Sequence, residues 1–218
     1  MIKKVNNSTF LLIGIILILS GIFLGSLDFF KEKKDKTFSD MNILLYENEN
    51  PTIISSEEEL ENIQEEKEEK SKEEEIPTET EDPVKKEYDY IGVLEIPKIN
   101  LKRGFVDINS KYNNVDYNIT IIKGSTYPEE ANNNLILAAH SGNCSVCFFD
   151  KLYKLNIGDR AYLNYKNTKY EYKIVDIYEV EKTGKVAIHR DYTKNVLTLI
   201  TCTNNSKTKQ TVYILELI

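Results

Sequence analysis

Two residues at the ends of strand-like runs are the ones in this chain best suited to chemistry. Cys202 ends the run Val196–Cys202, and His140 ends the apolar run Leu135–His140. A thiolate is a strong nucleophile, and an imidazole beside it can exchange protons near neutral pH. Polar segments follow both runs, so we expect two neighbouring strands to bring the thiol and the imidazole together at an exposed rim.

Each residue also has a purely structural interpretation. Cysteine is often buried as a small apolar residue, and a single histidine at a strand end is more often structural than catalytic. His189 is the other histidine of the chain, and it lies in the polar stretch 182–194, which is typical of an exposed loop. His140 is therefore the expected partner of Cys202.

Strand patterns dominate the chain after residue 90. Tyr, Ile and Val are abundant there, and Lys169–Val180 alternates apolar and polar residues as a half-buried strand does. The apolar spacing from Phe148 to Leu155 favours one short helix that stops before Gly158. The pattern predicts a mainly β closed barrel or sandwich. Its strands are expected at Ile91–Ile96, Leu101–Phe105, Thr120–Lys123, Leu135–His140, Ala161–Tyr165, Lys169–Val180, Asn195–Cys202 and Gln210–Leu217.

An uncharged segment near the N-terminus predicts a membrane anchor. Phe10–Leu27 reaches about 27 Å as a helix, enough for a bilayer core, so we expect a transmembrane anchor at residues 10–30 after a short tail at 1–9. The alternative is a cleaved signal peptide, but the run is long for one and no small-residue cleavage site follows. Lysines flank both ends, so charge alone does not set the orientation.

A charged stalk is expected at residues 31–87. The first 82 residues hold 9 Lys and Arg against 20 Asp and Glu, whereas the remaining residues hold 19 against 15. Glu57–Glu75 is almost entirely Glu and Lys and has no apolar heptad, which indicates a disordered or helical spacer rather than a coiled coil. The basic charge after residue 82 is diffuse and gives little support to nucleic-acid binding.

The pair Cys144 and Cys147 allows several interpretations. A zinc site would need a second pair of ligands, and a thioredoxin-like redox site would need a surrounding βαβ pattern. Two interpretations remain open: a short disulfide beside His140, or two free thiols that pack in the groove. No metal or cofactor is expected.

On these residues the chain resembles the sortases, the cysteine transpeptidases of Gram-positive surfaces. The sortase motif T-L-x-T-C is matched by Thr198–Cys202, and the apolar-His-small context is matched by Ala138–Gly142. The opening strand is similar over Ile91–Ile99, and Phe149–Asp159 has the Leu-x-x-Leu-x-x-Gly-Asp ending. The similarity covers about residues 88–218.

The resemblance implies an eight-stranded β-barrel outside the membrane, held by an N-terminal anchor. It also implies a cut-and-join reaction on surface proteins with a C-terminal sorting signal like Leu-Pro-x-Thr-Gly. Cys202 would attack the carbonyl after the Thr and form a thioester, and His140 would protonate the departing amine. An amine from a peptidoglycan precursor or a pilin lysine would then take the acyl group. Thr201 is a further candidate for contacting the substrate.

One departure concerns the third catalytic role. Sortases carry an Arg shortly after the cysteine, but no Arg follows Arg190 here, and Gln210 falls nearest the usual place. A Gln amide can donate hydrogen bonds to an oxyanion without a charge. Lys209 and Arg190 are the other candidates. The departure also leaves open a non-catalytic, surface-anchored binding module, and Cys144 with Cys147 leaves open a thiol oxidoreductase.

Overall fold

The computed structural model describes residues 7–51 and 88–218, and the chain divides into two compact units, Met1–Met41 and Asn42–Ile218. Helix α1 runs over Asn7–Glu49 and includes the uncharged segment Phe10–Leu27. Within the described ranges, no helix has both the length and the apolar character needed to cross a bilayer. The membrane anchor stays a prediction, and residues 52–87 of the expected stalk lie outside the described residues.

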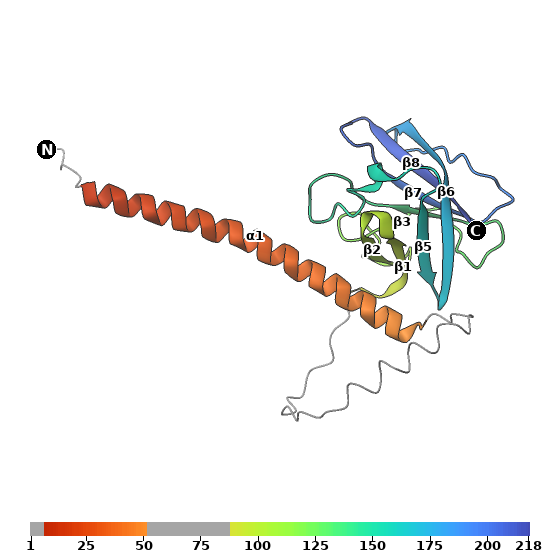
Figure 1. The fold of residues 1–218 in the computed structure, drawn as a ribbon, viewed down its shortest axis with the longest axis horizontal. Coiled ribbons are helices and arrows are strands. Elements are labelled where there is room, and N and C mark those ends of the chain that lie inside the picture. The colour runs from red at the N-terminus through yellow and green to blue at the C-terminus, as the bar shows by residue number, and fades with distance from the viewer. Residues whose placement is uncertain (1–6, 52–87) are drawn as a thin grey trace, which may run out of the picture. The chain divides into compact units, whose positions relative to one another are not determined.

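The second unit is a nearly closed barrel of eight strands (Figure 1). The strand order is β2-β1-β5-β6-β8-β7-β4-β3, and a bridge between Phe105 and Ile119 connects the two edges. The strands are β1 Tyr90–Ile96, β2 Leu101–Val106, β3 Thr120–Ile121, β4 Asn134–Ala138, β5 Arg160–Tyr165, β6 Thr168–Glu181, β7 Val196–Cys202 and β8 Lys209–Leu217. All eight expected strands are confirmed. The strand expected to end at His140 ends two residues earlier, at Ala138.

The helix expected over Phe148–Leu155 was wrong. The segment forms turns and one short 3₁₀ helix, η2 Leu152–Lys154, like η1 Pro97–Ile99 earlier in the chain. The backbone N–H of Phe149 donates to the carbonyl of His140 at 2.9 Å, which ties the segment back to the end of β4. A disulfide between Cys144 and Cys147 closes the preceding turn. The bonds that follow, from the Asp150 N–H to the Cys147 carbonyl and from the Leu152 N–H to the Phe149 carbonyl, have the spacing of turns and 3₁₀ helix, not of an α-helix.

Alternating side chains divide the buried residues between the two faces of the sheet. Odd-numbered residues of β4 and β7, such as Leu137 and Leu199, point into the main core. The even-numbered Ile136 and Ile200 join a second apolar cluster with Val212 of β8. Each fully buried Leu or Ile contributes about 1.5–3 kcal/mol, so both faces of β4 and β7 are held in place.

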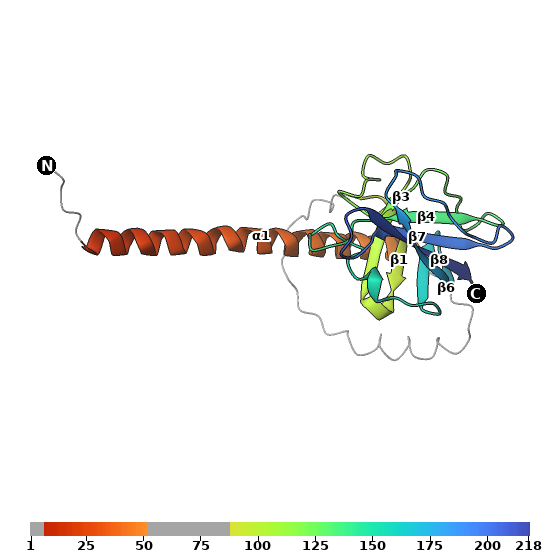
Figure 2. The ribbon, with the colours of Figure 1, turned by 90° about the horizontal axis from the view of Figure 1, so that it is seen from above.

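The register of three strands places the end of β7 at the centre of the possible site. β4 and β7 are parallel neighbours, with Ala138 opposite Ile200, and they lie side by side in Figure 2. β7 and β8 are antiparallel, with Cys202 opposite Gln210. The carboxyl ends of β4 and β7 and the start of β8 therefore meet at one rim of the barrel.

The last turns of α1 belong to the barrel unit. Ile43 and Tyr46 are buried in a cluster with Tyr90, Val93 and Val106. These two residues lie in the range that the sequence assigned to the stalk. They fall in a short apolar run, 43–46, which the sequence pattern left inside the stalk because charged segments lie on both sides of it.

The Tyr46 hydroxyl adds two polar contacts to this packing. It donates to the carbonyl of Ile91 at 3.0 Å and accepts from the backbone N–H of Lys166 at 3.1 Å. Burial raises the pKa of Tyr46, so the hydroxyl keeps the proton that it donates. The helix end is thereby tied to both β1 and the β5–β6 turn.

We predict that Tyr46→Phe lowers the free energy of unfolding by about 1 kcal/mol and Tyr46→Ala by about 3 kcal/mol. The first change removes the hydrogen bonds, and the second also leaves a cavity. Thermal and urea unfolding of the full chain measure both. Leu44→Ala is the matched control, because Leu44 is 59% exposed on the same helix. Equal stability of Tyr46→Ala and Leu44→Ala would contradict the packing.

Candidate active site

Three hydrogen bonds hold the segment after β4 against the end of β7. The N–H of Ala139 donates to the carbonyl of Ile200 at 3.4 Å, which extends the parallel ladder by one step. The Thr201 hydroxyl donates to the carbonyl of Ala139 at 2.8 Å, and the Ser141 hydroxyl donates to the carbonyl of Cys202 at 2.7 Å. These bonds keep His140 and Cys202 on adjacent stretches of backbone.

The two candidate residues also share a face of the sheet. Ala138 and Ile200 are opposite one another and belong to the second apolar cluster. His140 and Cys202 each follow two residues later, so the period of two places both on that same side. The sequence-based pairing of these two residues is therefore compatible with the register of the strands.

Both side chains can be reached by solvent. The His140 side chain is 40% exposed, and Cys202 is a half-buried free thiol. Cys202 is thus not sealed in the core, as a structural cysteine of this strand would be. A nucleophile needs this combination of partial burial and access.

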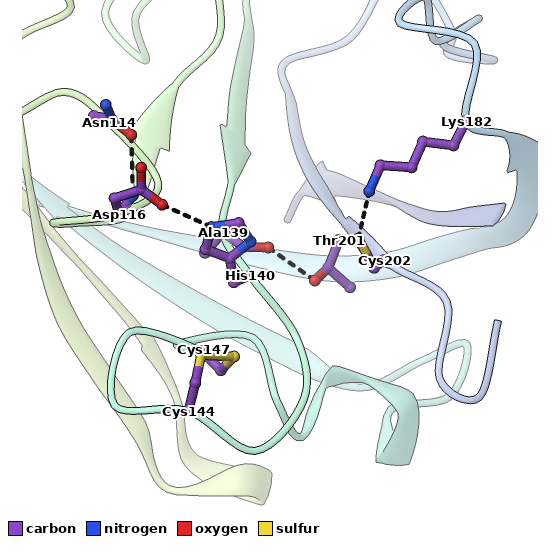
Figure 3. Close-up of polar contacts among 9 residues, drawn as sticks. All are labelled: Asn114, Asp116, Ala139, His140, Cys144, Cys147, Lys182, Thr201 and Cys202. Carbon is purple, nitrogen blue, oxygen red and sulfur yellow. Dashed lines mark hydrogen bonds and ion pairs between the residues drawn. A yellow bond between two sulfur atoms is a disulfide. The ribbon is translucent and has the colours of Figure 1, made fainter. Parts of the chain in front are cut away.

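The imidazole and the thiol each have a charged neighbour. Nε2 of His140 lies 3.2 Å from Oδ1 of Asp116, and Sγ of Cys202 lies 3.5 Å from Nζ of Lys182. Figure 3 shows the ring directed toward Asp116 and the sulfur directed toward Lys182. Among the residues that the structure describes, no hydrogen bond joins the imidazole to the thiol.

Asp116 and Lys182 were missed by reasoning from the sequence. Asp116 lies in the loop between β2 and β3, and its backbone N–H donates to Oδ1 of Asn114 at 3.0 Å. Lys182 directly follows β6. Neither residue belongs to a motif, and both come near the site through loop geometry that no spacing in the chain predicts.

The three candidates for the third role lie in different places. Gln210 is directly opposite Cys202 and shares its face of the sheet with Val212. The ammonium group of Lys209 pairs with Glu179 at 3.0 Å. Arg190 donates to the carbonyls of Asn132 and Asn133, just before β4 begins. Arg190 is therefore at the opposite end of β4 from His140, and Gln210 is the candidate beside the thiol.

A pocket of about 380 Å³ opens next to Cys202. One wall comes from the segment between β4 and β5. The other comes from the end of β7 and the first half of β8. Burial raises the pKa of Tyr213 in this wall to about 12, so its hydroxyl remains neutral at physiological pH. The lining residues are Ser141, Gly142, Asn143, Phe149, Asp150, Lys151, Tyr153, Lys154, Thr201, Cys202, Asn204, Thr211 and Tyr213.

The threonines before Cys202 connect β7 to β4. The Thr198 hydroxyl donates to Oδ1 of Asn134 at 2.8 Å, and Thr201 is buried with its hydroxyl proton on the Ala139 carbonyl. Thr201 lines the pocket, so its expected contact with a substrate stays a prediction. Its hydrogen bond already gives it a role in positioning the segment that carries His140.

The structure decides between the two open interpretations of Cys144 and Cys147. The residues form a disulfide in the loop between His140 and Phe149. Turns, not an α-helix, follow the disulfide. A thioredoxin-type site places its first cysteine at a helix N-terminus, so this pair lacks that means of activating a thiolate.

The comparisons with known proteins agree with this architecture. A family model described as Sortase domain matches residues 94–216. No curated protein matches the chain. Clostridium perfringens sortase D5 transpeptidase is 19% identical, with 84% of this chain and 99% of that one covered and a TM-score of 0.56.

Two other solved structures have similar folds. Streptococcus agalactiae sortase C1, in complex with MTSET, is 22% identical and covers 59% of this chain and 69% of its own, with a TM-score of 0.53. A lid mutant of Corynebacterium diphtheriae sortase A is 20% identical and covers 61% and 72%, with a TM-score of 0.52.

The chain belongs to the sortase family, because the family match spans more than half of its length. Members of this family are transpeptidases that act on sorting-signal substrates and amine acceptors. The similar structures include sortases named A, C and D.

We predict that Thr201→Val lowers the free energy of unfolding by about 1–2 kcal/mol, because the isosteric change leaves the buried Ala139 carbonyl without its donor. It should also slow alkylation of Cys202 by iodoacetamide. The ends of β4 and β7 separate without this bond, and the imidazole of His140 then lies farther from the thiol. Thermal unfolding and alkylation followed by mass measure these effects. Thr193→Val, in the exposed loop before β7, is the control. An unchanged stability would show that this bond does not hold the rim.

Proposed function

We propose that this chain is a membrane-anchored cysteine transpeptidase of a Gram-positive cell surface. It cleaves a sorting signal like Leu-Pro-x-Thr-Gly through a thioester on Cys202. It then joins the cleaved protein to an amine of a peptidoglycan precursor or a pilin. The observation that supports this most is the parallel pairing of β4 with β7, which brings His140 and Cys202 to one accessible rim.

The first half-reaction forms the thioester. The Cys202 thiolate bonds to the carbonyl carbon of the Thr, and the C=O electron pair moves onto oxygen. The carbonyl then re-forms as the C–N bond to Gly breaks. The departing amine takes a proton from the His140 imidazolium, so the products are the acyl-enzyme and a fragment with a free amine.

The second half-reaction reverses these steps with another amine. The acceptor amine attacks the thioester carbonyl and gives a proton to His140. Sγ leaves as a thiolate, and a new amide joins the two proteins. The pocket beside Cys202 has polar and aromatic walls. It can hold either the sorting signal or the acceptor amine.

Asp116 orients the imidazole in this scheme. Its carboxylate contacts Nε2, so the proton exchanged with sulfur or with the amine passes through Nδ1. A rotation of the His140 side chain about its own bonds can bring Nδ1 closer to Sγ, because the two residues stand on adjacent strand ends. The 40% exposure of this side chain leaves room for such a movement.

The cellular placement is part of the same proposal. Residues 10–30 anchor the chain, the parts of 31–87 on either side of the packed end of α1 act as a spacer, and the barrel faces outward. Only there would the enzyme meet surface proteins and cell-wall amines. The disulfide between Cys144 and Cys147 supports an oxidising compartment, since disulfides are rare in reducing cytosol.

We predict that Cys202→Ala abolishes hydrolysis and transfer of sorting-signal peptides, because the other two of the three cysteines are joined in a disulfide. His140→Ala should slow acylation by about 10²–10⁴-fold, the usual contribution of a general acid–base. Intact mass after incubation with a peptide panel detects the thioester, and a small primary amine reports transfer.

A matched variant separates the rival functions. The double variant Cys144→Ala, Cys147→Ala should still form the thioester. A thiol oxidoreductase would lose disulfide exchange in this double variant and keep it in Cys202→Ala. A binding module would turn over nothing in any form. Full activity of Cys202→Ala would refute the transpeptidase mechanism.

We also predict that Gln210→Ala slows acylation by about tenfold or more, because an amide opposite Cys202 can donate to the oxyanion. Gln210→Glu, which keeps the size but removes the donor, should be at least as slow. Single-turnover acylation measures both, with unfolding temperature as the control for fold. Unchanged acylation would remove Gln210 from the site.

A further inference from the structure

The site needs a positive charge that its sequence does not supply at the expected place. Acylation develops negative charge first on sulfur and then on the carbonyl oxygen, and a nearby cation stabilises both. Gln210 is neutral. We infer that Lys182 is the catalytic cation of this enzyme, an inference that rests on the proposed transpeptidase function.

The distance between the ammonium group and the nucleophile carries this assignment. Nζ of Lys182 lies 3.5 Å from Sγ of Cys202, within hydrogen-bonding distance for sulfur. The two groups are directed toward one another in Figure 3. An ammonium group in this position attracts the negative charge that the sulfur carries as a nucleophile.

The backbone around Lys182 holds it at the rim. Its N–H donates to the carbonyl of Thr208 at 2.6 Å, directly after the last paired residues of β6 and β8. Val180, Gln210 and Cys202 form one row across β6, β8 and β7. Lys182 follows Val180 by two residues, so its side chain extends the same face toward the thiol.

The other candidate cations have different partners or positions. Lys209 pairs with Glu179, and Arg190 donates to carbonyls before the start of β4, at the far end of that strand. Lys151 and Lys154 line the pocket wall between β4 and β5. Among the described residues, Lys182 is the cation within hydrogen-bonding distance of Sγ.

The same ammonium group can serve the oxyanion. When Sγ bonds to the carbonyl carbon, the negative charge moves two bonds away from sulfur, a displacement that a flexible lysine side chain can follow. Lys182 and Gln210 then approach the oxygen from adjacent strand ends, one with charge and one with a neutral donor. Together they replace a single guanidinium.

The decisive experiment compares Lys182→Met, Lys182→Arg and Lys185→Met in the full chain. Iodoacetamide alkylation of Cys202 at pH 7 reports the nucleophilic reactivity of the sulfur without any substrate. We expect Lys182→Met to slow alkylation about fivefold, the scale of an exposed ion pair, and to slow peptide acylation about tenfold or more. Lys182→Arg should stay within about threefold of the wild type because it keeps the charge.

Lys185→Met controls for a general loss of charge on this loop, because Lys185 is also exposed and does not contact Sγ. If iodoacetamide alkylates Cys202 of Lys182→Met at the wild-type rate, the inference is overturned and the thioester mechanism stays intact. If alkylation of Cys202 depends on Lys182 but no peptide forms a thioester, the contact between the two residues is supported and the transpeptidase function is contradicted. A hydroxylamine-resistant acyl group on Lys182 would also overturn the inference, because the lysine would then be an acceptor and not a retained cation.

Discussion

The parallel pairing of β4 with β7 is the constraint on which the rest of the site depends. These strands are far apart in the chain, and only their register sets His140 beside Cys202. The register is fixed from both faces of the sheet, by Leu137 and Leu199 inside and by Ile136 and Ile200 outside. A slip of one residue would exchange the two faces and bury the thiol. The hydroxyl of Thr201 then continues the connection beyond the last ladder bond.

The site distributes its charges over loops that surround this rigid rim. Asp116 comes from the β2–β3 loop and Lys182 from the end of β6, and each contacts one member of the proposed pair. Fixed strands place the reacting groups, and longer side chains on loops adjust the charge around them. This division is common in proteins, because loops tolerate variation while the core does not.

Much of the fold could be predicted from the sequence, because strand alternation and the motif around Cys202 are local patterns. Ile91–Ile96 and Lys169–Val180 show this clearly. The α-helix expected over Phe148–Leu155 does not form, because the backbone bond from Phe149 to His140 ties this segment to the end of β4 despite its apolar spacing. Cys202 and His140 could be found as strand ends, whereas Asp116 and Lys182 could not, since their places depend on loop conformations. The burial of Tyr46 was missed as well, because the apolar run 43–46 is too short to show which part of the chain it packs against.

Chemical cross-linking tests most directly whether residue 140 lies next to Cys202. Neighbouring strands lie about 4.8 Å apart, inside the Cα range of about 4.4–6.8 Å that a disulfide needs. His140→Cys, made with Cys144→Ala and Cys147→Ala, should therefore lose both free thiols under mild oxidation and gain one intramolecular disulfide. His189→Cys in the same background should keep two free thiols and form no disulfide within the chain, because residue 189 lies against Tyr178. If the His140→Cys chain keeps two free thiols under the same conditions, the pairing of imidazole and thiol is contradicted.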